Sequence, residues 1–249
     1  MAKVRAGDQV YNVDLIIFDK DGTLFDFSAM WKQIFLGQVA ALAELPGTRP
    51  ELIDDLCVSM GIQREGDSMD PLGPLALATY EEIRVIMASV LYRHGRPWDQ
   101  ALQLVDSVTD AANWPPLEEL VQPVGNLAGL FEKMAGAGLR IGIVTTDDRA
   151  MTETMLEMAG VRHFVAAMVC ADDGPALKPA PDGILALCRQ LQVIPERAMM
   201  VGDSPTDMQA AESAGITARV GVLSGVSRRD DLRPLASVVL TSIQDLQIE

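Results

Sequence analysis

The chain has 249 residues, a length that suits one large domain or two modest ones, and its 49% of apolar residues allow a sizeable buried core. Charged residues make up 22%, near the globular average, which argues against a wholly disordered chain. The formal net charge of −15 repels nucleic-acid phosphates and anionic lipid headgroups, so we expect neither nucleic acid nor a membrane as a partner.

The first residues of the chain lack the apolar stretch of a signal peptide, and no run approaches the roughly 20 apolar residues that span a bilayer. We therefore expect the protein in the cytoplasm. The negative charge would also repel a phosphorylated substrate at long range. Any phosphate site must then carry its own positive charge, from a metal or a lysine.

Short apolar runs alternate with helical patterns over most of the chain. The first run, Leu15–Phe18, ends at Asp19 and is typical of a strand buried on both faces of a parallel sheet. Similar runs predict strands at 141–144, 165–169, 199–201 and 238–240, and helical patterns predict helices at 126–137, 150–159, 181–191 and 206–214. From about residue 120 onward this alternation predicts an α/β fold with a parallel sheet and right-handed crossovers.

The stretch from about 26 to 118 has helical patterns without a convincing strand. Within it, Thr79 and Glu82 have the spacing of a capping box at the start of a helix, and Gly95 suits the end of that helix. The first strand is thus separated from its sheet partners by an insertion of about 90 residues. We expect two domains, a core made of 1–25 and 119–249 and a helical cap made of 26–118.

Four polar segments lie at or just past the predicted strand ends, where ligands bind in open α/β sheets. The first is Asp19-Lys20-Asp21-Gly22-Thr23. If the extended backbone persists, the two carboxylates share a face, so one could attack phosphorus while the other handles a proton. Gly22 lets the chain turn sharply. Alone, the segment also fits an ordinary junction between a strand and a turn.

Each of the other three segments is ambiguous by itself. Thr145 and Thr146 offer a hydroxyl and backbone N–H groups to phosphate oxygens, although Thr at a helix start is also a common N-cap. Lys178 precedes a predicted helix, either as a phosphate ligand or as a solvated surface group. Asp203 and Asp207 suit a hard cation such as magnesium, but acidic residues are also common in a first helical turn.

Taken in order, DxDGT, strand-Thr, Lys-Pro and GDSxxD, the four segments resemble the motifs of the haloacid dehalogenase superfamily of phosphohydrolases. The resemblance covers 12–25 and about 120–246, and the insertion looks like the helical C1 cap of that family. The resemblance implies a Rossmann-like core. Segments 221–225 and 242–246 are similar to the phosphoglycolate phosphatase branch.

The resemblance implies a two-step hydrolysis. Asp19 would attack phosphorus and form an aspartyl-phosphate, while Asp21 would give a proton to the leaving group and later take one from water. The expected cofactor is Mg²⁺, held by the Asp19 carboxylate, the Asp21 backbone carbonyl and Asp203. The phosphate would be bound by Gly22, Thr145, Thr146 and Lys178, and Asp207 would orient a water or Lys178.

The sequence departs from the usual pattern of the family at three places, one of which is Asp26-Phe27, where the phosphoglycolate phosphatase branch commonly has Asp-Ser. Lys20 stands where relatives usually have an apolar residue, and between Asp19 and Asp21 it should point away from both, with a neighbouring loop in reach. Thr146 stands where relatives often have Asn. None of the three departures removes the chemistry, but each bears on the identity of the substrate.

The expected partner is a small phosphate ester, with 2-phosphoglycolate the leading candidate and a sugar phosphate or pyrophosphate next. A phosphomutase would use the same two aspartates, and a retired enzyme that serves as a binding module is the alternative from another class. A dehalogenase or phosphonatase is disfavoured, because relatives with those chemistries lack the second aspartate. The oligomeric state stays open. Four arginines of the insertion could bind a second anionic group of the substrate, or they could be ordinary exposed helix residues. They are Arg64, Arg84, Arg93 and Arg96.

Overall fold

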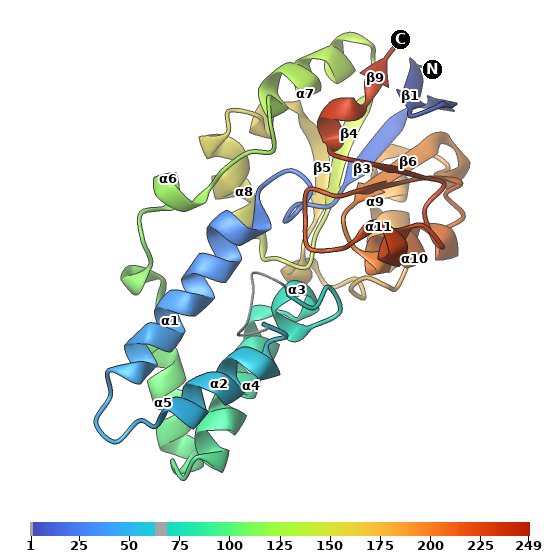
Figure 1. Ribbon diagram of the computed structural model, residues 1–249. Helices are drawn as coiled ribbons and strands as arrows, with labels where there is room; N and C mark the ends of the chain where they lie inside the picture. Colours follow the sequence, from blue (N-terminus) through green and yellow to red (C-terminus); the bar gives the residue numbers. More distant parts are fainter. Residues whose placement is uncertain (1, 63–68) are drawn as a thin grey trace. The chain divides into compact units, whose positions relative to one another are not determined.

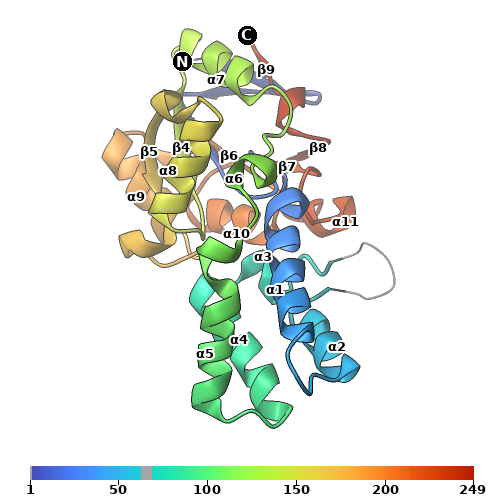
Figure 2. The ribbon, with the colours of Figure 1, turned by 90° about the vertical axis from the view of Figure 1, so that its left-hand side faces the viewer.

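The protein is described by a computed structural model that covers residues 2–62 and 69–249. The chain forms two compact units, Met1–Phe27 with Val121–Glu249, and Ser28–Leu120 (Figures 1 and 2). Arg64, one of the arginines considered for anion binding, lies outside the described residues. Among the described residues, no helix is both long and apolar enough to cross a membrane.

The larger unit is built on a six-stranded parallel sheet with the strand order β5-β4-β3-β6-β7-β8 (Figure 1). Its strands are β3 Leu15–Phe18, β4 Arg140–Val144, β5 Val165–Val169, β6 Ala198–Gly202, β7 Ala218–Val222 and β8 Val238–Leu240. Every residue of β3 is buried, as expected for a central strand covered on both faces. The predicted α/β fold with a Rossmann-like parallel sheet is confirmed.

Helices cover both faces of this sheet because successive side chains of a strand point to opposite sides. Leu15 and Ile17 belong to a core cluster with α9 (Asp182–Leu191) and α10 (Pro205–Ser213). Phe18 points the other way and stacks on Phe131 at 5.5 Å between ring centroids. Phe131 belongs to α7 (Leu127–Gly136), and the remaining helices of this unit with four or more residues are α8 (Arg149–Met158) and α11 (Arg229–Leu232).

A small antiparallel sheet adds a feature that the sequence analysis missed. β1 (Ala2–Ala6) and β2 (Gln9–Val13) form a hairpin, and β9 (Gln247–Ile248) pairs with β1. Gly7 lies in the turn with a φ of +57°, a conformation that glycine adopts without strain. The N- and C-terminal segments therefore lie side by side (Figure 1).

The smaller unit is helical. It contains α1 Gln33–Ala43, α2 Pro50–Ser59, α3 Pro74–Leu77, α4 Tyr80–Arg93, α5 Trp98–Thr109 and α6 Leu117–Leu120. The predicted capping box is confirmed, because Glu82 N donates to Thr79 Oγ1 at 3.3 Å while Thr79 N donates to Glu82 Oε2 at 2.8 Å. Gly95, with a φ of +91°, follows the end of α4 as predicted.

The two chain segments that lead into and out of the insertion pair with each other inside the larger unit. Asp26 N donates to Gln122 O at 2.8 Å, and Val124 N donates to Leu24 O at 2.8 Å. An antiparallel bridge between Phe25 and Pro123 lies between these two hydrogen bonds. The entry and exit points are thus fixed beside each other, directly after the segment that carries Asp19 and Asp21.

Candidate active site

Three aspartates meet where two neighbouring strands end. Asp19 follows β3 and Asp203 follows β6, and these strands are paired in parallel, so both carboxylates emerge at the same edge of the sheet. With Asp207 they form a cluster in which one carboxylate oxygen from each residue lies within 4.8 Å of the other two. All three residues are buried.

The start of α10 positions Asp207. Ser204 is the N-cap residue of this helix, and its backbone N–H donates to Asp207 Oδ2 at 3.0 Å. The carboxylate thereby turns back toward the strand ends. Gly202 leaves room for it, since a Cβ atom at that position would lie 2.3 Å from Asp207 Oδ2.

Lys178 joins two of the carboxylates. Its Nζ lies 2.6 Å from Asp19 Oδ1 and 2.6 Å from Asp207 Oδ1, and its side chain is almost fully buried. Burial opposes the charge of this ammonium group, but the charges of Asp19 and Asp207 outweigh burial and raise the pKa of Lys178. Lys178 is therefore a permanent cation of the cluster.

One ammonium group does not balance three carboxylates. Burial raises the pKa of Asp19 to about 7, against the lowering effect of Lys178, and the charges of Asp207 and Asp21 add to the rise. Burial, with the charges of Asp19 and Asp207, also raises the pKa of Asp203 well above its ordinary value. A buried set of oxygen donors with excess negative charge fits a divalent cation such as Mg²⁺. Asp19, Asp203 and Asp207 could hold a metal here.

The loop after β7 holds Asp203 in place, a role that the sequence analysis did not assign. Val226 N donates to Asp203 Oδ2 at 3.2 Å, and Thr23 Oγ1 donates to Asp203 Oδ1 at 3.4 Å. A Cβ atom on Gly225 would lie only 1.8 Å from Asp203 Oδ2. The signal for this loop in the sequence was the segment 221–225, which includes Gly225 and is similar to the phosphoglycolate phosphatase branch.

The same loop supports the turn after Asp21. Ser224 Oγ donates to Gly22 O at 2.8 Å. Gly22 has a φ of +80°, and a Cβ atom there would lie 2.5 Å from Asp203 Oδ2. Glycine is therefore required at position 22 both for its backbone conformation and for its closeness to Asp203.

Thr145 and Thr146 follow β4 at the same edge of the sheet. The N-cap of α8 is Asp148, which accepts a hydrogen bond from Met151 N at 2.8 Å, so neither threonine caps this helix. Thr145 is buried, and its Oγ1 accepts a hydrogen bond from Asp147 N at 3.1 Å. A hydroxyl that accepts in this way keeps its O–H to donate to an anion. Thr146 is half-buried.

Lys20 is fully buried, and its Nζ lies 2.6 Å from Asp21 Oδ1 and 3.0 Å from Asp147 Oδ2. The prediction that it points away from Asp21 is wrong. The alternation of a strand ends here, because the Lys20 carbonyl accepts hydrogen bonds from the backbone N–H groups of Leu24 and Phe25. Its contact with Asp147 confirms the expected reach to a neighbouring loop.

The charges of this second cluster depend on one another. Burial opposes the charge of Lys20, but the carboxylates of Asp21 and Asp147 raise its pKa. Burial raises the pKa of Asp147 to about 6, against the lowering effect of Lys20, and the charge of Asp21 adds to the rise. Lys20 is thus a buried cation shared by two carboxylates.

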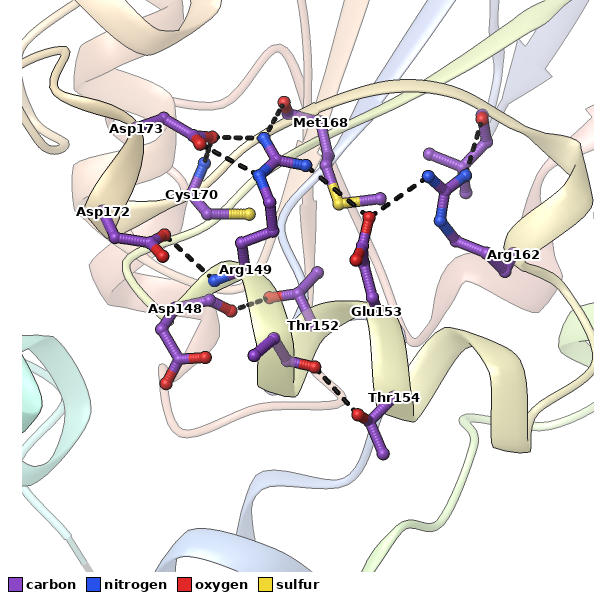
Figure 3. A network of polar contacts seen from close by, with 12 residues as sticks. Asp148, Arg149, Thr152, Glu153, Thr154, Arg162, Met168, Cys170, Asp172 and Asp173 are labelled. Atoms are coloured by element: carbon purple, nitrogen blue, oxygen red, sulfur yellow. Dashed lines mark hydrogen bonds and ion pairs between the residues drawn. The ribbon is translucent and has the colours of Figure 1, made fainter.

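A network around Arg149 fixes the start of α8, directly after the loop that carries Thr145 (Figure 3). Arg149 Nε and Nη2 donate to the two carboxylate oxygens of Asp173 at 3.0 and 2.5 Å, and Nη2 also donates to Met168 O at 3.1 Å. Its backbone N–H donates to Asp172 Oδ1 at 3.0 Å. These contacts tie α8 to the loop after β5.

The three described arginines that were considered for anion binding have partners within their own unit. Arg84 forms a bidentate pair with Asp106, and Arg96 Nη2 donates to Pro46 O at 3.2 Å. Arg93 lies 4.0 Å from Asp55 and has a largely exposed side chain. Their binding of a substrate anion stays a prediction.

Comparisons with known proteins bear on both the family and the fold. A model of the haloacid dehalogenase-like hydrolase family matches residues 13–215. A phosphoglycolate phosphatase of Salmonella typhimurium is 26% identical over 212 residues, which cover 84% of this chain and 81% of that protein. A phosphoglycolate phosphatase of Shigella boydii is 26% identical over 237 residues, which cover 93% of this chain and 90% of that protein.

Two solved structures have the same fold. A predicted phosphoglycolate phosphatase of Haemophilus somnus superimposes with a TM-score of 0.68 at 18% identity, covering 94% of this chain and 96% of that one. A protein of Thermotoga maritima, assigned provisionally as a β-phosphoglucomutase, superimposes with a TM-score of 0.66 at 19% identity. The match covers 91% of this chain and 94% of that one. At these identities the solved structures bear on the fold alone.

Proposed function

The chain belongs to the haloacid dehalogenase-like hydrolases, and on that premise we propose that it hydrolyses a small phosphate monoester through a phosphoaspartate at Asp19. The predicted resemblance to this family and to its phosphoglycolate phosphatase branch is confirmed, as is the enzyme class, a phosphatase. The observation that supports the proposed nucleophile is the buried contact of 2.6 Å between Asp19 and Lys178. A carboxylate held by a permanent cation at a strand end suits attack on a phosphate.

In the first step, an oxygen of Asp19 forms a bond to phosphorus while the bond to the ester oxygen breaks. Lys178 holds Asp19 Oδ1, which leaves Oδ2 for the attack. Asp21, on the same loop, donates a proton to the departing alkoxide. In the second step, Asp21 takes a proton from water, which attacks phosphorus and frees Asp19.

Positive charge and N–H or O–H donors stabilise the transferring phosphoryl group. Lys178 and the hydroxyl of Thr145 would take this role, and Gly22 and Thr146 are the other residues that we expect to bind the phosphate. Mg²⁺, held by Asp19 and Asp203 with the Asp21 backbone carbonyl, would neutralise the negative charge between the carboxylates and the phosphate. Asp207 keeps Lys178 in position.

We favour 2-phosphoglycolate as the substrate because relatives that match most of the chain are phosphoglycolate phosphatases. The helical unit, residues 28–120, would act as a cap that reads the leaving group and excludes water. A phosphomutase remains the second candidate, because it would use the same two aspartates, Asp19 and Asp21. A mutase would return the phosphate to a sugar rather than release it.

The test is release of inorganic phosphate from a panel of esters, with and without Mg²⁺. The panel contains 2-phosphoglycolate, several sugar phosphates, pyrophosphate and p-nitrophenyl phosphate. We expect the highest kcat/KM with 2-phosphoglycolate. A value no better than that for p-nitrophenyl phosphate would remove this substrate while leaving the phosphatase mechanism, and transfer without phosphate release would favour the mutase.

A further inference from the structure

We propose that Lys20 and Asp147 are positioning residues for Asp21, and that this buried ion pair fixes the carboxylate that moves the proton. The inference rests on the proposed function, because it concerns the proton-transfer residue of that reaction. It begins from Lys20, which stands where relatives usually have an apolar residue and whose role the four motifs do not explain.

The geometry of the three side chains supports this role. Lys20 Nζ lies 2.6 Å from Asp21 Oδ1, 3.0 Å from Asp147 Oδ2 and 3.1 Å from Met155 Sδ. Lys20 is completely buried, whereas the side chains of Asp21 and Asp147 are 18% and 13% exposed. The ammonium group therefore lies behind the two carboxylates, away from solvent.

A buried lysine carries a large desolvation cost unless it is paired, so its contacts with the two carboxylates are strongly favoured in the fold. Asp147 belongs to the loop after β4, and Asp21 belongs to the loop after β3. Lys20 thereby links the loop of the proton-transfer residue to the loop that carries Thr145. With Oδ1 held by Lys20, Asp21 has Oδ2 as the oxygen that exchanges a proton.

The distinguishing property of such a role is its dependence on the leaving group. An alkoxide needs a proton as it departs, whereas p-nitrophenolate departs without one. Loss of Asp21 positioning must then slow hydrolysis of an alkyl phosphate far more than that of p-nitrophenyl phosphate. A general loss of stability would slow both reactions alike.

The experiment compares Lys20→Met, Asp21→Asn and the double variant on 2-phosphoglycolate, or on the best alkyl ester of the panel, and on p-nitrophenyl phosphate. For Lys20→Met we expect kcat/KM on the alkyl ester to fall by about tenfold to a hundredfold, the size expected when a catalytic group shifts by about 1 Å. The loss on p-nitrophenyl phosphate should be several-fold smaller. The double variant should be no slower than Asp21→Asn alone, because both changes remove the same function.

Two further variants serve as an alternative test and as a control. Asp147→Asn retains Lys20 and should give a smaller loss with the same leaving-group dependence, so it carries the test if Lys20→Met does not fold. Arg197→Met is the matched control, since it breaks an ion pair of 2.6 Å with Asp14 at the opposite end of β3. It should affect both substrates equally.

The inference is overturned if Lys20→Met lowers kcat/KM equally on the two substrates. If Lys20→Met does not fold, the same result for Asp147→Asn overturns it. The inference is also overturned if the double variant loses as much activity as the two single changes combined. If Asp21→Asn is sensitive to the leaving group and the other variants are not, only this inference fails. If the wild-type protein releases no phosphate, the proposed function fails and takes the inference with it. If Asp21→Asn loses equally on both esters, Asp21 is not the proton donor, and the inference falls with that role while the hydrolysis at Asp19 stands.

Discussion

Replacing Asp19 with Asn should abolish turnover and, in protein stripped of metal, should stabilise the fold. The amide has nearly the same shape but is a poor nucleophile, so activity should be lost without a change of structure. The gain in stability follows from the buried cluster. Without a metal, Asp19 shares its site with two other carboxylates and only one ammonium group.

The pKa of Asp19 gives the size of this gain. Its pKa rises from 3.8 to about 7, chiefly through burial. The folded protein therefore binds this proton more tightly than the unfolded chain, and stability falls as the pH rises from about 4 to 7. The rise of the Asp19 pKa from 3.8 to about 7 corresponds to a loss of roughly 4 kcal/mol of folding stability, which is complete above pH 7. Asn cannot ionise, so the variant lacks this cost.

The assay is urea unfolding of both proteins in EDTA at pH 8 and at pH 5.5. The variant should be more stable by about 4 kcal/mol at pH 8 and by about half of that at pH 5.5. Adding Mg²⁺ should then stabilise the wild type more than the variant, because ligand binding stabilises the folded state that holds it. Asp14→Asn, at the other end of β3 and paired with Arg197, is a control that should show no such gain.

A variant that is less stable than the wild type at pH 8 in EDTA would refute this reasoning. It would mean that Lys178 outweighs burial and that the cluster has no excess negative charge to offer a cation. Retention of even a tenth of the activity in a clean preparation would separately remove Asp19 as the nucleophile.

Two more predictions concern the aspartate cluster, and a third concerns the cap of α4. Asp203→Ala should raise the Mg²⁺ concentration needed for activity or abolish turnover, and full activity of the wild type in excess EDTA would contradict a metal site. Gly225→Ala should lower kcat/KM by about a hundredfold because its Cβ would displace Asp203, whereas Gly136→Ala, which meets nothing within 4 Å, should have no effect. Thr79→Ala should destabilise the helical unit by about 1 kcal/mol in urea unfolding, through loss of the α4 cap, and an unchanged midpoint would count against this capping role.

The parallel sheet could be predicted because buried strands such as Leu15–Phe18 are continuous apolar runs. The limits of the predicted core helices were within one residue of the observed ones. For 126–137 against Leu127–Gly136, the two extra residues are the N-cap and the C-cap. The hairpin of β1 and β2 was missed although Ala2, Val4 and Ala6 alternate with polar residues before Gly7. That period-two signal is short, and two of its three apolar positions are alanines, which are depleted in strands. β7 was missed because Arg219 and Gly221 interrupt its apolar run.

At the site, the sequence indicated which residues carry chemistry but not how their side chains turn. Asp19 and Asp203 could be placed together because neighbouring parallel strands end at one edge. The direction of Lys20 depends on a tight turn after Asp19, which breaks the alternation that a strand would impose. The resemblance of 221–225 to one branch of the family marked Gly225, but it did not show that this glycine lies against Asp203, because that contact joins positions 22 residues apart in the chain.

The hydrogen bonds between Asp26 and Gln122 and between Leu24 and Val124 make the helical unit a removable part of the architecture. For the sheet, whatever lies between Phe27 and Val121 is equivalent to the tip of a hairpin, because the pairing ends before the insertion begins. The entropy of closing a longer loop grows only slowly with its length, so these pairs tolerate an insertion of almost any size. Exchange of the whole insertion for that of a relative could therefore change the substrate while leaving Asp19, Asp203 and Lys178 in place.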